Sequence, residues 1–160
     1  MKTIHQWFSE YGESHQNPTN KLIHWICVPS IFFSIIGLLC SVPVVFLSGA
    51  FPPVLAPYIN LATIVLCIGL LFYLRLSFSL FIGMLLFSIF TLFGNLYLER
   101  LNIAPLWLIS IGIFTIAWIG QFYGHKIEGK KPSFLKDIQF LLIGPAWLMG
   151  FVYQKLGIKY

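Results

Sequence analysis

LIHWICVPSIFFSIIGLLCSVPVVFL, residues 22–47, is the stretch of sequence that decides the fold of this chain. It contains no Asp, Glu, Lys or Arg, and it is longer than the roughly 20 apolar residues that carry an α-helix across the hydrocarbon core of a bilayer. The uncharged stretch continues to residue 74, and three more follow at 76–98, 101–125 and 138–154. The sequence therefore predicts an integral membrane protein built from helices.

The overall composition supports this class and excludes others. Of the 160 residues, 58% are hydrophobic and 9% are charged, and the mean hydropathy is +0.85, which is too apolar for a water-soluble domain. The net charge of +5 comes from few cations without a basic stripe, so we do not expect a nucleic acid partner. Cys27, Cys40 and Cys67 lie in apolar stretches without CxxC spacing, which favours free core thiols over a disulfide or metal ligands.

Proline, glycine and charged residues divide the chain into segments of a single membrane domain, residues 1–160. We expect an all-α, multi-pass transmembrane helical bundle with four full spans and a short N-terminal interfacial helix within residues 1–17. The fifth apolar segment carries Gly144-Pro145 at its centre, so we expect it to be a kinked fifth span or a broken, partly re-entrant hairpin. The five segments are expected at about 18–47, 58–74, 76–98, 104–124 and 135–154.

The N-terminal segment has the pattern of an amphipathic helix. Trp7, Phe8, Tyr11 and His15 fall at i, i+1, i+4 and i+8, which is one stripe of a helix lying in the membrane interface. The Asn-Pro pair that follows ends this helix and starts the first span, because a proline at the first helical position lacks an amide hydrogen that would go unpaired there.

The placement of lysine and arginine sets the expected orientation. With the N-terminus in the cytoplasm, only Arg100 among the loop cations falls on the opposite side, as the positive-inside rule requires. We therefore expect the N-terminus on the cytoplasmic side of a bacterial inner membrane or an endoplasmic reticulum. The cytoplasmic loop cations would be Lys2, Lys21, Arg75, Lys126, Lys130, Lys131 and Lys136.

This topology brings three of the four histidines to one face of the membrane. His15 precedes the first span, His24 lies about one turn inside that span, and His125 ends the fourth. Three neutral imidazoles with open coordination positions make a catalytic metal site for iron, zinc, copper or nickel. His5 lies ten residues before His15, so a helix would turn it away from the cluster, and we expect a surface histidine there.

Polar residues at helical spacing accompany each of these histidines. A metal-bound histidine needs a partner that holds its second ring nitrogen, and residues three, four or seven apart share one face of a helix. Glu128 is expected to be either a fourth ligand or such a partner, unless it only pairs with Lys130 or Lys131. The candidate partners are Tyr11 for His15, Asn20 for His24, and Gln121 and Glu128 for His125.

Lysines would ring the mouth of this site. Lys126 and Lys131, together with Lys21 and Lys130, could contact lipid headgroups or catch a fatty carboxylate. We favour headgroup contact for most of them, and keep Lys126 and Lys131 as candidates for contact with substrate.

The same residues carry a family resemblance. YGESHQNPTNKLIHWICVP, residues 11–29, resembles the Y-x3-H-x4-N-x3-H-x4-P signature of a small multi-pass membrane family, the fungal-type 2-hydroxy fatty acid dioxygenases. WIGQFYGHKIEGKKPSFLKD, residues 118–137, is similar to the second block of that family in order and composition. The matching residues are Tyr11, His15, Asn20, His24 and Pro29, and then Gln121, Gly124, His125, Glu128 and Pro132.

The resemblance implies an iron(II)-dependent dioxygenase that carries out α-oxidation of 2-hydroxy fatty acids, shortening the acid by one carbon and releasing carbon dioxide. It implies Fe(2+) as the cofactor, with a 2-hydroxy fatty acid and O2 as substrates in contact with membrane lipid. The iron ligands would be His15, His24 and His125, and Glu128 would be catalytic. Supporting roles would fall to Tyr11, Asn20, Gln121, Lys126 and Lys131.

Three other functions stay open on the residues alone. A zinc-dependent hydrolase of a membrane lipid would use the same three histidines with Glu128 as its base. A haem or electron-carrier protein would use His24 and His125 as axial ligands. A non-catalytic scaffold or small transporter would need no metal at all.

Overall fold

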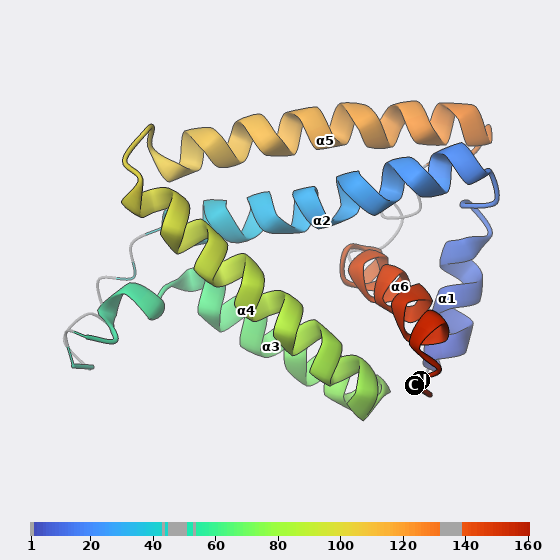
Figure 1. Ribbon diagram of the computed structural model, residues 1–160, viewed down its shortest axis with the longest axis horizontal. Coiled ribbons are helices and arrows are strands. Elements are labelled where there is room, and N and C mark those ends of the chain that lie inside the picture. The colour runs from blue at the N-terminus through green and yellow to red at the C-terminus, as the bar shows by residue number, and fades with distance from the viewer. Residues whose placement is uncertain (1, 43, 45–50, 53, 132–138) are drawn as a thin grey trace.

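The computed structural model describes residues 2–42, 44, 51–52, 54–131 and 139–160, and in these residues the chain is helical and has no strand (Figure 1). This confirms the all-α class. The helices are α1 (Ile4–Gly12), α2 (Pro18–Cys40), the 3-10 helix η2 (Ala56–Tyr58), α3 (Leu61–Leu76), α4 (Phe78–Arg100), α5 (Leu106–Glu128) and α6 (Gln139–Leu156).

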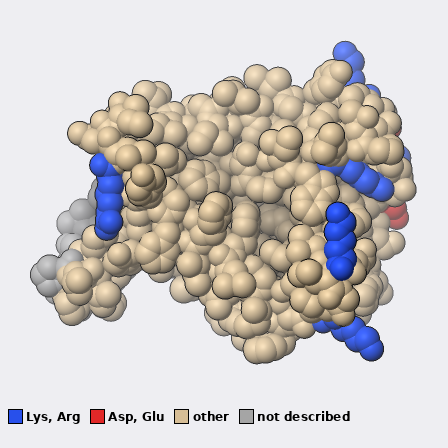
Figure 2. Space-filling view, in the orientation of Figure 1, with Lys and Arg blue, Asp and Glu red and all other residues tan. Residues whose placement is uncertain are grey.

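Three helices, α2, α4 and α5, are long and apolar enough to cross a membrane, by length and composition. They correspond to the first, third and fourth predicted spans. The helix at the second predicted span, α3, has only 16 residues, and the apolar part of α6, Phe140–Leu156, is also shorter than a full span. Figure 2 shows Lys and Arg side chains near the two ends of this face and an uncharged middle, as a membrane-embedded body requires.

Two helix boundaries differ from those expected. The first span was expected to reach residue 47, but α2 ends at Cys40 with Ser41 as its C-cap, and residues 45–47 lie outside the described part of the chain. The helix α6 continues through Gly144-Pro145 from Gln139 to Leu156, so the described residues show one helix there and not a broken hairpin. Its expected start at residue 135 also lies outside the described residues.

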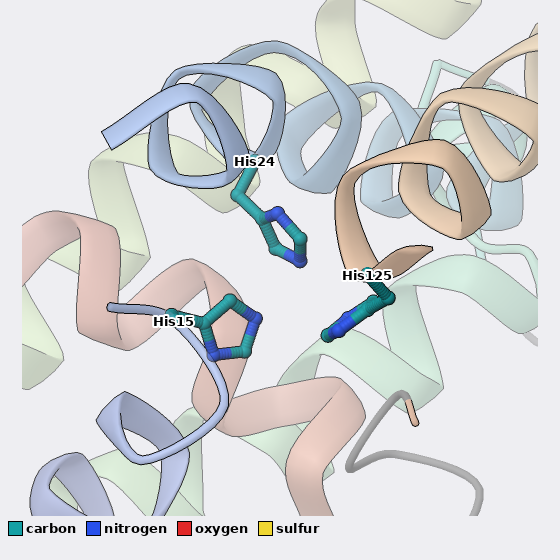
Figure 3. A group of neighbouring side chains, drawn as sticks. All are labelled: His15, His24 and His125. Atoms are coloured by element: carbon teal, nitrogen blue, oxygen red, sulfur yellow. The ribbon is translucent and has the colours of Figure 1, made fainter. Parts of the chain in front are cut away.

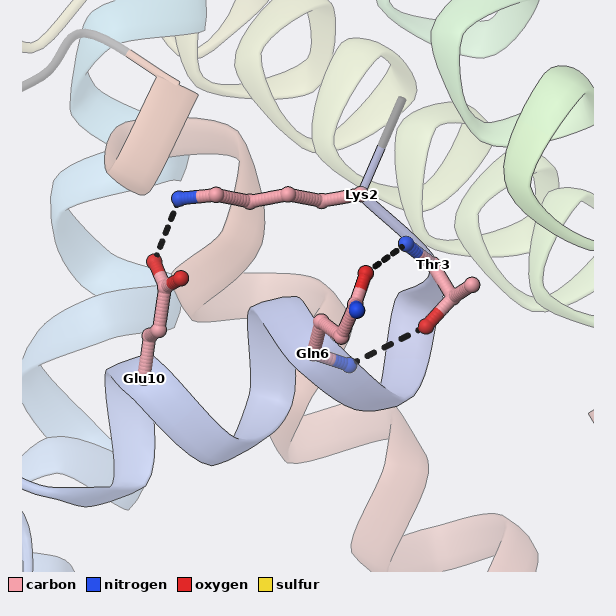
Figure 4. A network of polar contacts seen from close by, with 4 residues as sticks. All are labelled: Lys2, Thr3, Gln6 and Glu10. Atoms are coloured by element: carbon pink, nitrogen blue, oxygen red, sulfur yellow. Dashed lines mark hydrogen bonds and ion pairs between the residues drawn. The ribbon is translucent and has the colours of Figure 1, made fainter.

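The N-terminal helix α1 begins with a complete capping box (Figure 4). Thr3 Oγ1 accepts from the Gln6 amide at 3.3 Å, and Gln6 Oε1 accepts from the Thr3 amide at 2.8 Å, which satisfies two amides that a helix start leaves unpaired. Lys2 and Glu10 form an exposed ion pair at 2.7 Å beside it. Of the predicted stripe, Trp7 and Tyr11 are buried and Phe8 is half-buried in α1, and this face packs onto α6 of the same chain. His15 was expected on the same helix, but α1 ends at Gly12 and His15 lies in the turn that follows.

The helices α2 and α5 lie side by side and antiparallel along most of their lengths (Figure 1). Glycines permit this approach, since a Cβ at Gly120 would meet Cys27 Sγ at 2.6 Å and one at Gly124 would overlap Asn20 Oδ1. The two glycines are four residues apart, which is the small-xxx-small spacing of tightly packed membrane helices. The N-terminal turn of α2 is thereby fixed beside the C-terminal turn of α5.

A second close approach lies at the other end of this pair. Gly37 of α2 faces Asn95 of α4 and Ser110 of α5, and a Cβ on Gly37 would overlap both polar side chains. Asn95 Nδ2 donates to the carbonyls of Phe33 at 3.0 Å and Thr91 at 2.9 Å, which ties α2 to α4 in an apolar interior.

Substitution of Gly37 by valine tests this contact. We expect Gly37→Val to lower the free energy of unfolding by about 1–3 kcal/mol, because the added methyl groups overpack the α2–α4–α5 junction. The matched control is Gly112→Val, since Gly112 lies on α5 with no heavy atom within 4 Å of the place that a Cβ would occupy. Thermal unfolding of both variants in the same detergent measures the difference, and equal midpoints would contradict the predicted contact.

Candidate metal centre

Three histidines from separate segments converge at one end of the α2–α5 pair (Figure 3). His24 comes from α2, His125 from α5, and His15 from the turn between α1 and α2. The ring centroid of His15 lies 4.3 Å from that of His24 and 5.1 Å from that of His125, and the remaining pair is 4.9 Å apart. The cluster therefore brings together residues that are far apart in the sequence.

Each of the three rings offers a nitrogen to the centre of the cluster. One nitrogen from each lies within 4.8 Å of those of the other two. His15 and His24 are each 1% exposed and His125 is 4% exposed, so water has little access to them. His15 Nε2, His24 Nε2 and His125 Nδ1 are buried without a hydrogen-bond partner among the described residues.

The second nitrogens of two rings are held by backbone carbonyls. His15 Nδ1 pairs with the Tyr11 carbonyl at 2.5 Å, and His24 Nδ1 pairs with the Asn20 carbonyl at 2.9 Å. In both cases the carbonyl belongs to the residue four positions earlier. An acceptor at Nδ1 fixes the proton there and leaves the lone pair on Nε2, which is the tautomer that a metal requires.

Burial also keeps the His15 imidazole neutral. It lowers the pKa of His15 from 6.5 to about 3, chiefly because the charged form would lose its hydration, and the neighbouring His24 lowers it further. A ligand to a divalent ion must be unprotonated, so His15 is in the form that binds metal at neutral pH without any prior proton loss.

The Glu128 carboxylate lies beside the cluster and binds the turn between α1 and α2. It accepts hydrogen bonds from the Gln16 amide at 2.8 Å, the Asn17 amide at 2.9 Å and Asn20 Nδ2 at 3.0 Å. Among the described residues, the side chains whose potential ligand atoms converge are the three histidines. Glu128 therefore fixes the end of α5 to the segment that carries His15, and its oxygens are engaged there.

A lysine adds a second link between the same segments. Gly129 ends α5 in the left-handed region at φ 71°, where glycine is favoured, and the chain then turns so that Lys130 Nζ donates to the Glu13 carbonyl at 2.6 Å. The turn that carries His15 is thus held to α5 by both Glu128 and Lys130. These two contacts fix the irregular turn that carries His15 to the end of α5.

The remaining predicted residues divide into buried and exposed ones. Tyr11 stacks on His15 with ring centroids 4.3 Å apart, and the buried Gln121 side chain lies against His24. Burial raises the pKa of Tyr11 above its ordinary value, so its phenol stays protonated. Lys126 and Lys131 are exposed.

His5 stands apart from the centre, as the helical period indicates. It belongs to α1, is exposed, and lies against Tyr160 with ring centroids 5.9 Å apart. It provides an internal control for experiments on the other three histidines.

The arrangement fits a metal ion better than it fits a haem. Three unpartnered ring nitrogens in a buried site are costly unless a common partner satisfies them, and an ion with histidine ligands does so. A haem held between His24 and His125 would have to displace His15, whose ring lies beside both. Iron and zinc both accept this donor set.

The Tyr11 and Asn20 carbonyls that orient two of the rings were not predicted from the sequence. No residue type marks a carbonyl acceptor, so side-chain spacing carries no signal for it. The role of Lys130 in holding the Glu13 carbonyl was missed for the same reason.

Comparison with known proteins gives two matches. A family model described as 2-hydroxy-palmitic acid dioxygenase Mpo1-like matches residues 1–156. A Saccharomyces cerevisiae protein named 2-hydroxy-palmitic acid dioxygenase MPO1 is 32% identical over 151 residues, and the alignment covers 92% of this chain and 78% of that protein. No solved structure matches the chain.

Metal loading tests the cluster directly. We expect wild-type protein to bind one divalent ion per chain, and His15→Ala, His24→Ala or His125→Ala to lower its affinity at least about tenfold, because each variant removes one ligand. His5→Ala is the matched control and is expected to bind like wild type. Titration with Fe(II), Co(II) and Zn(II) under anaerobic conditions measures this, and an equal loss in the His5 variant would contradict the assignment.

Glu128 is expected to act through the position of His15 and not as a ligand. We expect Glu128→Ala to weaken metal binding by about 10- to 100-fold, since the turn loses three hydrogen bonds, and Glu128→Gln to retain part of the affinity through its remaining acceptor oxygen. Glu13→Ala, an exposed carboxylate in the same turn, is the control.

The visible absorption of bound Co(II) separates the two roles of Glu128. A positioning residue leaves the ligand set intact, so the Co(II) spectrum of saturated Glu128→Ala is expected to match that of wild type. A changed spectrum would identify Glu128 as a fourth ligand and overturn the positioning role.

Proposed function

The chain belongs to the 2-hydroxy-palmitic acid dioxygenase Mpo1-like family, and we propose that it is itself an iron(II)-dependent dioxygenase that shortens 2-hydroxy fatty acids by one carbon. The observation that carries this proposal is the buried cluster of His15, His24 and His125, in which three ring nitrogens have no hydrogen-bond partner in the part of the chain that the structure describes. Its ring geometry supports a bound ion, and family membership supports the substrate class.

The proposed reaction balances without an added electron donor. A 2-hydroxy acid and O2 give the acid that is one carbon shorter, carbon dioxide and water: the bond between the carboxyl carbon and the hydroxyl-bearing carbon breaks, both of those carbons are oxidised, and O2 is reduced. Iron(II) bound by the three histidines would supply the site for O2 activation and for chelation of the substrate carboxylate and hydroxyl.

Residues around the cluster support this chemistry through position and exclusion of water. Glu128 and Lys130 hold the turn that carries His15, and the stacked Tyr11 ring covers one face of that imidazole. The phenol of Tyr11 stays protonated, so it is a hydrogen-bond donor and not a base. Gln121, buried beside His24, is a further polar side chain next to the cluster.

We also propose that the metal centre lies at the cytoplasmic side of the membrane. The end of the α2–α5 pair that carries the histidines also carries exposed Lys126, Lys130 and Lys131, and the positive-inside rule favours the cytoplasm for such a cluster. The surrounding cations support contact with anionic headgroups at this level.

Oxygen-dependent turnover tests the proposed function. We expect purified protein with stoichiometric Fe(II) to convert 2-hydroxypalmitate to pentadecanoate with release of carbon dioxide in air, and to be inactive without oxygen. His125→Ala is expected to lose at least about 1000-fold in kcat/KM, since the metal site is incomplete, while His5→Ala retains activity. Product analysis by mass spectrometry with 18O2 checks the result.

Two outcomes would overturn this function. Turnover of a lipid ester under anaerobic conditions with Zn(II) would indicate the zinc-dependent hydrolase. Full activity of His125→Ala on 2-hydroxypalmitate would remove the histidine cluster from the reaction.

A further inference from the structure

Two apolar pockets lie between the helices beside the metal centre. The near pocket is bounded by α1, α2, α5 and α6 and is lined in part by Tyr11, Val28, Phe32, Gln121, Leu141 and Gly144. The far pocket is bounded by α2, α3, α4 and α6 and is lined in part by Phe32, Ile36, Gly69, Tyr73, Leu141 and Leu142. Phe32 and Leu141 line both, so these two side chains separate one pocket from the next.

The near pocket is lined by two residues that contact the histidines of the candidate metal centre. Tyr11 lines it and stacks on His15, and Gln121 lines it and lies against His24. Gly144 permits the phenol to reach this position, because a Cβ there would come within 3.0 Å of Tyr11 Oη. Tyr11 and Gln121 therefore connect the histidine cluster to the near pocket.

The two pockets together follow α2 into the membrane. From His24 to Phe32 the helix rises roughly 12 Å, and from His24 to Ile36 roughly 18 Å. Half of a hydrocarbon core is about 15 Å thick, which is the depth that an acyl chain of one leaflet spans. The residues that line the two pockets thus extend along α2 over a depth comparable to that of an acyl chain in one leaflet.

The lining of the far pocket suits a methyl-terminated chain. No Asp, Glu, Lys or Arg is among its lining residues. The Tyr73 hydroxyl, which could otherwise demand a polar partner, already donates to the Leu142 carbonyl at 2.7 Å. The pocket is therefore lined mainly by apolar groups, with Ser88 and Tyr73 as polar side chains in its lining.

We propose that the two pockets form one path for the acyl chain of the substrate, and that the far pocket around Gly69 sets the longest chain that binds productively. This inference rests on the proposed function, since it takes the 2-hydroxy acid headgroup to lie at the histidines. Phe32 and Leu141 are the constriction that a long chain passes and a short chain does not reach.

Gly69 is the position at which this path can be shortened with little strain. The heavy atom nearest to a Cβ at Gly69 is Leu142 Cδ2 at 3.8 Å, which is ordinary van der Waals contact. A larger side chain there would extend into the far pocket without displacing backbone. A leucine also favours the helix more than glycine does.

The test compares Gly69→Leu with the matched control Gly112→Leu, which makes the same change on α5 at a position with no neighbour within 4 Å. Both are assayed in lipid nanodiscs with Fe(II), O2 and 2-hydroxy acids from octanoate to stearate. We expect Gly69→Leu to lower the kcat/KM ratio of 2-hydroxypalmitate to 2-hydroxyoctanoate by at least about tenfold, as filling a hydrophobic pocket does elsewhere. The ratio is expected to change less than about twofold in Gly112→Leu, and equal ratios in the two variants would overturn the proposal.

A photolabel gives a second readout that needs neither turnover nor a folded variant. Wild-type protein is illuminated anaerobically with 2-hydroxypalmitate that carries a diazirine at its terminal carbon, and labelled residues are mapped by mass spectrometry. We expect labels around Gly69, Ile36 and Leu142 that disappear with excess unlabelled 2-hydroxypalmitate. Labels confined to lipid-facing residues such as Ile68 and Leu71, or insensitive to competitor, would overturn the path.

Failure of the inference and failure of the proposed function give different results. Wild-type turnover of all chain lengths with an unaltered profile in Gly69→Leu would remove the path and leave the dioxygenase in place. Labelling of the far pocket that excess unlabelled 2-hydroxypalmitate prevents, in a protein that converts no 2-hydroxy acid, would support the path and contradict the proposed function.

Discussion

The close packing of α2 against α5 is the constraint on which the metal centre depends. Gly120 and Gly124 bring the helices to a separation at which Cys27 and Asn20 occupy the space of the missing side chains. Because the two helices are antiparallel, this contact sets the first turns of α2 beside the last turns of α5, and His24 and His125 meet with ring centroids 4.9 Å apart. Lipid drives helix association weakly, so such packing carries much of the fold.

The histidine cluster beside this contact is locally unfavourable in free energy. Unpartnered polar nitrogens in a buried site are unfavourable, and the rings are nonetheless held facing one another by fixed carbonyls and by the Glu128 links to the turn. The His15 turn, which would move freely if it were a simple loop, is fixed at both of its sides. The surrounding structure offsets this unfavourable free energy, as is typical of sites that are preorganised for a ligand.

The helices were predictable because charge-free runs leave few alternatives, but their ends were not. The apolar run continues past Cys40, and hydropathy does not distinguish an apolar helix from an apolar connection, so α2 was expected to be longer than it is. At Gly144-Pro145 the expected disruption does not end α6, and the glycine instead makes room for Tyr11.

The convergence of the three histidines followed from topology and charge, since the predicted topology places all three on the same face of the membrane. The partners that orient the rings did not follow. Helical spacing shows which side chains share a face. Asn20, however, accepts from His24 with its backbone carbonyl and donates to Glu128 with its side-chain amide. Only the folded structure reveals these two separate contacts. Likewise, the four-residue spacing of Gly120 and Gly124 can be found in the sequence. The sequence does not show whether such a pair packs two helices of one chain or helices of two chains.

The proposed position of the histidine cluster at headgroup level suits the proposed substrate. A 2-hydroxy fatty acid lies in a leaflet with its carboxylate at the interface, and withdrawing its chain into water would cost about 0.8 kcal/mol for each CH2 group. An enzyme avoids that cost if its reactive centre lies at headgroup level and its apolar path runs toward the bilayer midplane. The proposed centre and path both lie along α2, with His24 in its second turn and Phe32 and Ile36 further along the same helix lining the two pockets. A substrate could then enter from the lipid, keep its orientation and depth, and present only its polar end to the histidines.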